Sequence, residues 1–224
     1  MQVFFERREE IAPGIWQYAF RPERRVDFAP GQYTDLHLSG VHNDPRGSSR
    51  TFSFTSLPDD PSITFILKHF ELQSSYKQVL QSLHPDDVAK IDDAIGDLIL
   101  PKDPAVPLVF VAGGIGIASY ASMLQHLSSR REERNIYLFY QLRNRREQIF
   151  RELTEGYPLQ LKQIVLAPNR VSAQEIKATT PPDSLLYLSG SQTFVETLRA
   201  DLEALGTLRS QIVFDYYDGY AAEI

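Results

Sequence analysis

Two glycine-containing turns are the first candidates for chemistry in this sequence. Gly113, Gly114 and Gly116 follow the apolar run LVFVA, and Gly190 ends a second apolar run, LLYLSG. Glycine lets a ligand approach the backbone closely, and the free N–H groups at the start of a helix bind phosphate. The turns therefore predict a nucleotide site. AGGIGIAS matches neither Walker A nor the complete GxGxxG pattern, so the alternative, glycines that serve only tight strand-to-helix turns, stays open.

The stretch RTFSFTS is a second candidate, because it places three useful side chains on one short strand. An arginine pairs with phosphate, an aromatic side chain packs on a ring system, and a serine hydroxyl forms hydrogen bonds. Side chains alternate along a strand, so we expect Arg50 and Phe52 to share one face with Phe54, and Thr51 and Ser53 the other. An ordinary half-buried strand fits the same alternation.

Composition excludes several classes of function. The net charge of −6 argues against nucleic acid or an anionic membrane as the main partner. The chain has no cysteine, which excludes disulfides, a thiol nucleophile and a cysteine-ligated iron–sulfur cluster. Its five histidines are scattered, so no metal site is expected. No apolar run approaches a membrane span, and the N-terminus lacks the apolar core of a signal peptide, so we expect a cytoplasmic protein.

The two halves of the sequence differ in their pattern of apolar and turn residues. Up to about residue 100, short extended runs alternate with turn residues, which indicates an antiparallel barrel or sandwich. The runs are VFFERREEI, GIWQYAF, QYTDLHLSG, RTFSFTS and SITFILKHF. Between them and the second half, SSYKQVLQSL has apolar residues at the spacing of a helix.

From about residue 106, apolar strands alternate with helical patterns, which predicts a doubly wound, five-stranded parallel sheet. The strand candidates are 108–112, 135–141, 161–167, 185–190 and 211–217. With the strand order 3-2-1-4-5, both glycine turns would line one crevice beyond the carboxyl ends of the strands, where such sheets bind ligands. The proline-rich segment 100–107 suggests a boundary, giving a β-barrel domain at 1–103 and an α/β domain at 104–224.

Seven segments match, in order along the chain, the motifs of one known family. They are PGQY ending at Tyr33, Arg50-Thr51-Phe52-Ser53, Ser74-Ser75-Tyr76, Ala112-Gly113-Gly114-Ile115-Gly116-Ile117-Ala118, Tyr140-Gln141-Leu142-Arg143, Ser189-Gly190-Ser191 and Phe214-Asp215-Tyr216-Tyr217-Asp218-Gly219-Tyr220. With them the chain resembles the ferredoxin–NADP⁺ reductase superfamily, specifically its compact bacterial flavin reductase and oxygenase-reductase members. The resemblance covers nearly the whole chain.

This resemblance implies FAD on the barrel and NADPH or NADH on the α/β domain, with hydride passing from nicotinamide C4 to flavin N5. Arg50 would hold an FAD phosphate, Phe52 would pack on the flavin, and Ser75 would contact the pyrophosphate. Catalytic positions fall on Ser53, Ser189 and Tyr217. The cofactor-binding positions are Tyr33, Arg50, Thr51, Phe52, Ser53, Ser74, Ser75, Gly113, Gly114, Gly116, Ile117, Arg143, Gly190 and Tyr220.

The sequence departs from the family's pattern at several of these positions. Leu72 and Gln73 stand where the second flavin segment has glycine, Ser119 replaces a proline, and Ser189 replaces a cysteine. Serine is close to cysteine in shape, so we expect the change at residue 189 to slow hydride transfer rather than abolish it.

The choice between NADPH and NADH depends on charge near the end of the second parallel strand. Arg143, Arg145 and Arg146 follow that strand and Arg170 follows the third, which favours the 2′-phosphate of NADPH. The alternative explanation of the same arginines is a solvated helix face.

The main hypothesis is an FAD-dependent NAD(P)H oxidoreductase. Without cysteine the chain cannot carry its own [2Fe–2S] cluster, so the acceptor is expected to be a separate ferredoxin-like protein, an oxygenase or a small molecule. The alternative is a flavoprotein-like docking or regulatory subunit of a larger redox complex with weak or no NAD(P)H turnover, which the departures at Leu72 and Ser189 favour.

Overall fold

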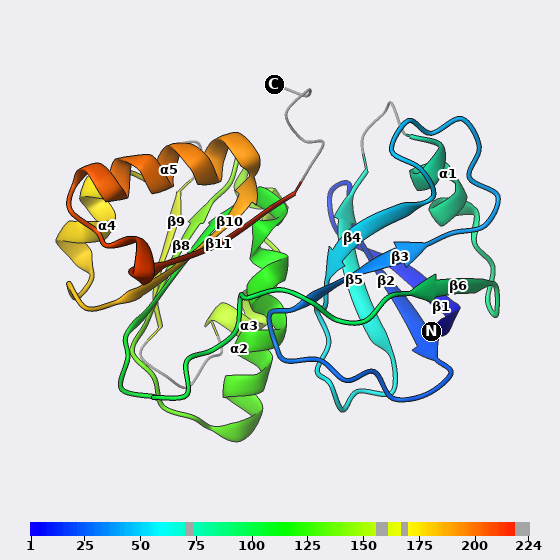
Figure 1. Ribbon diagram of the computed structural model, residues 1–224, viewed down its shortest axis with the longest axis horizontal. Helices are drawn as coiled ribbons and strands as arrows, with labels where there is room; N and C mark the ends of the chain where they lie inside the picture. The colour runs from blue at the N-terminus through cyan, green and yellow to red at the C-terminus, as the bar shows by residue number, and fades with distance from the viewer. Residues whose placement is uncertain (70–73, 156–160, 167–169, 218–224) are drawn as a thin grey trace.

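The computed structural model places an antiparallel sheet beside a parallel sheet, with helices around the second (Figure 1). It describes residues 1–69, 74–155, 161–166 and 170–217. The antiparallel sheet comes from the N-terminal half of the chain and the parallel sheet from the C-terminal half, which confirms the predicted fold class. The exact division at residues 103 and 104 stays a prediction. Among the described residues, no helix is long and apolar enough to cross a membrane.

Within the described residues the antiparallel sheet has six strands in the order β4-β3-β6-β1-β2-β5. Their bounds are β1 Gln2–Ala12, β2 Ile15–Pro22, β3 Tyr33–His37, β4 Ser49–Ser53, β5 Ile63–Lys68 and β6 Val88–Ile91. The two edge strands approach each other just beyond β4, where Thr55 N donates to Thr64 O at 2.9 Å. The sheet therefore curls into a barrel, and its apolar face encloses a core rich in phenylalanine.

Helix α1, Ser75–Ser82, packs on this core as its helical spacing predicted. Tyr76 and Leu80 are buried, and the Tyr76 hydroxyl donates to the backbone oxygen of Leu36 at 2.8 Å. Strand β6 was missing from the predicted runs. It has only four residues, with Ala89 and Ile91 buried, and so short an alternation is not recognisable without the neighbouring strands β1 and β3.

Within the described residues the parallel sheet has five strands in the order β11-β10-β7-β8-β9, which is the predicted order 3-2-1-4-5. Its elements are β7 Leu108–Gly113, η1 Gly114–Ile117, α2 Ala118–Arg130, β8 Ile136–Gln141, η2 Arg145–Glu147, α3 Arg151–Glu155, β9 Leu161–Leu166, α4 Ala173–Thr179, β10 Leu185–Ser191, α5 Gln192–Ala204, η3 Arg209–Gln211 and β11 Ile212–Tyr217. Alternate residues of β7 face opposite layers. Phe110 packs towards α2, and Val109 and Val111 pack towards α4 and α5.

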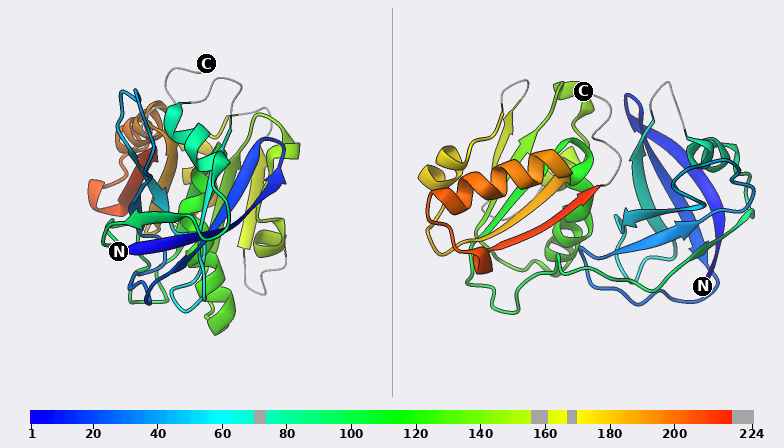
Figure 2. Two further views of the ribbon diagram at one scale, coloured as in Figure 1. Left: turned by 90° about the vertical axis from the view of Figure 1, so that its right-hand side faces the viewer. Right: turned by 45° about the horizontal axis from the view of Figure 1, so that its top comes forward.

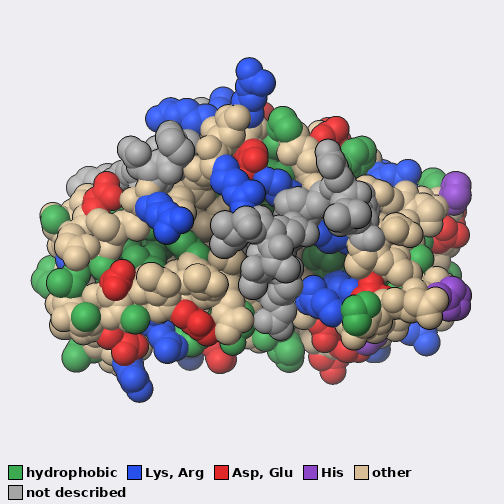
Figure 3. All heavy atoms as spheres, turned by 90° about the horizontal axis from the view of Figure 1, so that it is seen from above, with side chains coloured by type: hydrophobic (Ala, Val, Ile, Leu, Met, Phe, Trp, Pro, Cys, Tyr) green, Lys and Arg blue, Asp and Glu red, His purple; other side chains and the backbone are tan. Residues whose placement is uncertain are grey.

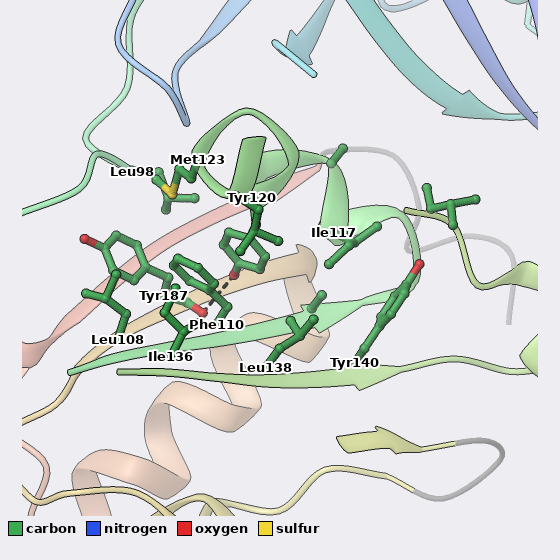
Figure 4. Close-up of a cluster of buried hydrophobic side chains, with 14 of the residues drawn as sticks. Leu98, Leu108, Phe110, Ile117, Tyr120, Met123, Ile136, Leu138, Tyr140 and Tyr187 are labelled. Carbon is green, nitrogen blue, oxygen red and sulfur yellow. Dashed lines mark hydrogen bonds between the residues drawn. The ribbon is translucent and has the colours of Figure 1, made fainter. Parts of the chain in front are cut away.

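Helix α2 lies between the parallel sheet and the barrel (Figures 1 and 2). The face of α2 that includes Tyr120, Leu124 and Leu127 packs on the parallel sheet, and Figure 4 shows Tyr120 in this cluster. The Tyr120 hydroxyl also hydrogen-bonds to the backbone oxygens of Val111 and Tyr187, at 3.0 and 2.8 Å. The first turns of α2 are buried all round because the opposite face meets the barrel.

Polar side chains of α2 fasten the barrel to the parallel sheet. Ser122 Oγ accepts the N–H of Gly31 at 2.9 Å, and Gln125 donates to the backbone oxygen of Thr55 at 2.7 Å. Gly31 has φ +99°, and a Cβ there would overlap the backbone of residue 98. The helix that follows the glycine turn thus also connects the two sheets through hydrogen bonds to the barrel backbone.

Candidate functional site

The guanidinium of Arg50, on β4, lies against the start of α1. It donates to Asp44 Oδ1 at 2.7 Å and to the backbone oxygens of Arg46, Gly47 and Ser49, and its Cζ is 4.8 Å from the centre of the Tyr76 ring. The Arg50 side chain is only 10% exposed. The predicted phosphate-binding arginine is therefore already engaged by groups of its own chain.

Asp44 occupies the centre of this cluster. Its carboxylate accepts the backbone N–H of Tyr76, at the first turn of α1, and the N–H of Arg46, both at 3.0 Å. Burial alone would raise the pKa of Asp44, but these two N–H groups and the Arg50 guanidinium lower it to about 2. An arginine and a helix N-terminus together form an anion site, and here the anion is a carboxylate of the protein.

The two serines at the start of α1 hold the same region together. Ser74 Oγ caps the helix by accepting the N–H of Lys77 at 3.4 Å. Ser75 Oγ accepts the N–H of His42 at 3.2 Å, so it ties the loop between β3 and β4 to the helix. Both predicted phosphate-contacting serines thus lie at the anion site.

The outward face of β3 and β4 carries the other predicted barrel residues. Thr51 is exposed and donates to Asp35 Oδ1 at 2.6 Å. Tyr33 is partly exposed, and burial and then the negative charges of Asp215 and Asp35 raise its pKa.

Phe52 points the other way, as the predicted alternation requires. It is 9% exposed, and its ring packs 5.5 Å from that of Phe65 and 6.4 Å from that of Tyr76. Most of the Phe52 ring therefore belongs to the barrel core, and little of it is available to a ligand.

Three serine hydroxyls meet where the barrel faces the parallel sheet. Ser119 Oγ, at the start of α2, is 3.2 Å from Ser53 Oγ on β4 and 3.1 Å from Ser189 Oγ on β10. Each of these residues is at most 3% exposed. The two catalytic serine candidates are therefore connected through Ser119, which the sequence singled out only as a departure from the family's proline.

The glycines of the two turns serve different purposes. A Cβ on Gly116 would overlap the backbone of Ser189, and one on Gly113 or Gly190 would press on the ring of Phe194. Those three glycines permit close packing of the chain on itself. Gly114 differs, because its φ is +54° and a Cβ would meet nothing within 4 Å. Of the predicted glycines it is the one that faces open space.

Positive charge follows the ends of β8 and β9. Arg143, Arg145, Arg146 and Arg170 are all exposed, and Arg145 and Arg146 lie in η2, a single turn of 3-10 helix. Lys and Arg side chains also gather near the middle of the face shown in Figure 3, beside the region where the two halves meet. Lys68 on β5 reaches across to Glu147 in an ion pair of 2.7 Å.

Some predicted positions lie at the limits of the structure. Ile117 is buried at the end of η1, beneath the glycine turn. Tyr217 ends β11, where its backbone pairs with Ser191. Tyr220, Leu72 and Gln73 lie outside the described residues.

Sequence reasoning missed Asp44 and Phe194. Asp44 belongs to HNDPRG, where an acidic residue is typical of a turn, and its partners come from β4 and α1. Phe194 reads as one member of an apolar stripe on α5, whose contact with two glycines depends on the strand order.

Comparisons with known proteins point to one kind of protein. No family model matches the chain. It is 24% identical over 217 residues to the reductase component of propane 2-monooxygenase from Rhodococcus jostii (strain RHA1), covering 88% of this chain and 57% of that protein. It is 33% identical over 122 residues to reductase component 2 of terephthalate 1,2-dioxygenase from Comamonas sp, covering 54% of this chain and 34% of that protein. The chain thus spans less than two thirds of either relative.

Solved structures show the fold directly. A ferredoxin-NADP⁺ reductase from Neisseria gonorrhoeae with bound FAD and NADP has a TM-score of 0.78 at 17% identity, covering 96% of this chain and 98% of that one. Phthalate dioxygenase reductase has a TM-score of 0.76 at 19% identity, covering 96% and 67%. The chain has the ferredoxin–NADP⁺ reductase fold, and its relatives include reductase components of oxygenases.

Proposed function

We propose that this chain is an FAD-dependent NAD(P)H reductase that passes electrons to a separate acceptor. The observation that carries the proposal is the hydroxyl chain from Ser53 through Ser119 to Ser189. It connects the strand of the flavin motif to the turn of the nucleotide motif at one buried point. Ligands held by the two motifs would meet there, and hydride transfer needs reacting atoms within roughly 3.5 Å of each other.

The barrel residues fit a flavin phosphate in their chemistry. Arg50 and the N–H of Tyr76, in the first turn of α1, already hold the carboxylate of Asp44, and phosphate oxygens use the same kind of donors. Arg50, Ser74 and Ser75 would contact the phosphates of FAD, either beside the carboxylate of Asp44 or in its place. Tyr33 and Thr51 would lie beside the flavin on the outward face of β3 and β4.

The parallel sheet supplies the nucleotide side. The open space at Gly114 would let a dinucleotide approach the backbone at the start of α2. The exposed Arg143 after β8, with the other arginines that follow, favours NADPH over NADH through its 2′-phosphate.

When bound, FAD would accept hydride from the nicotinamide and release electrons singly or in pairs. The residues of the chain position the reaction rather than take part in acid–base chemistry. The three hydroxyls are neutral, buried and joined to one another, so they fix the distance between β4 and β10 and keep water out of the contact.

The relatives suggest the kind of acceptor. Their names describe reductase components of a monooxygenase and a dioxygenase. The present chain has no cysteine, so its own residues cannot hold a thiolate-ligated cluster. We therefore infer that it reduces an oxygenase component or an iron–sulfur protein.

A reconstitution experiment tests this proposal. The purified protein is incubated with FAD, freed of unbound flavin, and mixed with NADPH or NADH without oxygen while the visible absorbance of the flavin is recorded. We expect retained FAD and bleaching by both nucleotides, with a lower KM for NADPH. A protein that retains no flavin, or whose flavin neither nucleotide bleaches, contradicts the proposed activity.

The second candidate function is a docking or regulatory subunit. Two observations favour it: Asp44 already pairs with Arg50, and the Phe194 ring lies against Gly113 and Gly190. In the same experiment this subunit would bind FAD without being reduced. It would also form a stable complex with a redox partner, which size-exclusion chromatography of the mixture would detect.

A further inference from the structure

The loop between β3 and β4 folds over the anion site of the barrel. Besides the contacts of Asp44, Gly47 N donates to the backbone oxygen of Asp44, and Leu38 N donates to that of Ser48, both at 2.9 Å. His42 N donates to Ser75 Oγ, so the loop is bound to α1 as well. This places the carboxylate in the centre of the site, where its side chain is 1% exposed.

The donors of the anion site all point at one carboxylate. The Tyr76 N–H points at Asp44 Oδ2 and the Arg50 Nη2 at Asp44 Oδ1. A phosphate that uses these donors must either displace the carboxylate or lie against it and be repelled, and in a buried site that repulsion is weakly screened. Either way, part of the binding free energy of the phosphate is lost.

We propose that Asp44 competes with the flavin phosphate and so sets how much the phosphates of a flavin contribute to binding. This specificity role rests on the proposed flavin-binding function. Asp44 acts as an internal substitute for phosphate, and the wild-type protein recognises a flavin mainly by its ring and ribityl chain. Riboflavin, FMN and FAD then bind with similar affinity.

Because the pKa of Asp44 is low, its carboxylate competes with phosphate to the same extent throughout the neutral pH range. Its partners keep the carboxylate ionised throughout the neutral range. Arg50 and the Tyr76 N–H face it from β4 and α1, and the negative charge of Asp35 acts on the neighbouring Tyr76 hydroxyl. Only a change of sequence or a movement of the loop removes the competitor.

The test compares three flavins on two proteins. Dissociation constants of riboflavin, FMN and FAD are measured by quenching of flavin fluorescence, for the wild type and for Asp44→Asn. The amide keeps an oxygen that can accept from Tyr76 N but removes the charge. We expect FAD and FMN to gain about 10- to 100-fold in affinity, as a freed charge-assisted hydrogen bond allows, and riboflavin less than about 3-fold.

Asp60→Asn is the matched control. Asp60 also caps a turn of the barrel, where its carboxylate accepts the N–H of Leu57 at 2.8 Å, and it is exposed. Removing its charge changes the net charge equally, so a gain for FAD in this variant too would overturn the proposal in favour of a general charge effect.

The wild type alone also decides the matter if Asp44→Asn does not fold. A wild-type preference for FMN over riboflavin below about 10-fold supports the proposal, and a larger preference overturns it. If all three flavins bind both proteins, and Asp44→Asn does not gain more affinity for FMN and FAD than for riboflavin, this inference is wrong but the proposed function stands. Absence of binding by all three flavins contradicts the proposed function itself.

Discussion

The two candidate ligand regions of this molecule differ in what shapes them: charged side chains in the barrel and close backbone packing at the glycine turn. The barrel site around Arg50 is a concentration of charge, buried and already neutralised by Asp44. The turn at Gly113–Gly116 is shaped by backbone contacts and hydroxyls, and among the described residues the first turn of α2 carries no acidic side chain. The same fold thus keeps one region closed by an internal anion and leaves the other accessible at Gly114. The barrel site should respond to changes of charge and the glycine turn to changes of volume.

The largest effect is expected when the charge pair of the barrel is broken. Arg50→Ala leaves the Asp44 carboxylate buried without its cation, which should lower the free energy of unfolding by about 3 kcal/mol or more. Urea denaturation measures the loss. The double variant Arg50→Ala/Asp44→Ala should be more stable than Arg50→Ala, because no charge is then left unpaired. Equal stability of the single and double variants would show that the barrel site does not depend on charge.

A change of volume should act next most strongly, on the glycine turn. In Gly116→Ala the new methyl group meets the backbone of Ser189, which cannot move aside cheaply, so we expect a loss of at least about 2 kcal/mol in the free energy of unfolding. Gly114→Ala is the matched control, with open space around the methyl group and a cost of about 1 kcal/mol from its positive φ.

These two variants separate packing from binding. Gly114→Ala should cost more in the free energy of dinucleotide binding than in the free energy of unfolding. Isothermal titration with NADP⁺ would measure the loss of binding. If Gly116→Ala and Gly114→Ala lower the free energy of unfolding by the same amount, the two glycines do not differ in how closely the chain packs around them.

Acid should weaken the barrel site in a defined range. The pKa of Asp44 lies below its usual value of 3.8, at about 2, so the folded state binds this proton less readily than the unfolded state. The resulting stabilisation is present above about pH 4, amounts to about 2 kcal/mol, and is lost as the pH falls towards 2. Urea denaturation of the wild type and Asp44→Asn should show the difference between them shrinking in that range. If the difference in free energy of unfolding between the two proteins stays constant down to pH 2, Asp44 is not the group that makes the barrel site sensitive to acid.

The smallest effect on stability is expected between the two regions, at Ser119. Ser119→Ala removes both hydroxyl contacts and should cost about 1 kcal/mol. It should also slow reduction of the flavin by roughly 10-fold at saturating NADPH with little change in KM, because positioning is lost rather than binding.

Ser129→Ala on the same helix is the control for Ser119→Ala. Its hydroxyl donates only to His126 O, at an exposed position, so rapid-mixing measurements should find the wild-type rate. An unchanged rate in Ser119→Ala would leave the serine chain with a purely structural role.

The sequence predicted the architecture well because strand and helix periodicities are local signals. The helix at SSYKQVLQSL and the opposite facing of Thr51 and Phe52 follow from such patterns, whereas the predicted strand order of the parallel sheet comes from the usual order of doubly wound sheets and agrees with the structure. The roles of Asp44 and Ser119 cannot be predicted from local patterns. Each depends on partners from distant segments, α1 for Asp44 and both β4 and β10 for Ser119, which only the assembled fold brings together.

The two glycine turns show the same limit. The sequence left open whether their glycines serve ligand or packing, and nothing in the local pattern distinguishes Gly114 from Gly116. The neighbouring strand β10 decides it, because its backbone fills the space beside Gly116 and leaves that beside Gly114 open.

The central claim, that a nicotinamide and a flavin meet beside the serine chain, is tested most directly by isotope transfer. FAD-loaded protein is mixed rapidly and without oxygen with NADPH that carries deuterium at C4 on one face. Direct transfer predicts that flavin reduction is several-fold slower with deuterium on one of the two faces and unchanged with deuterium on the other. Absence of flavin reduction, or the same rate with all forms of the nucleotide when reduction is limited by chemistry, would contradict the claim.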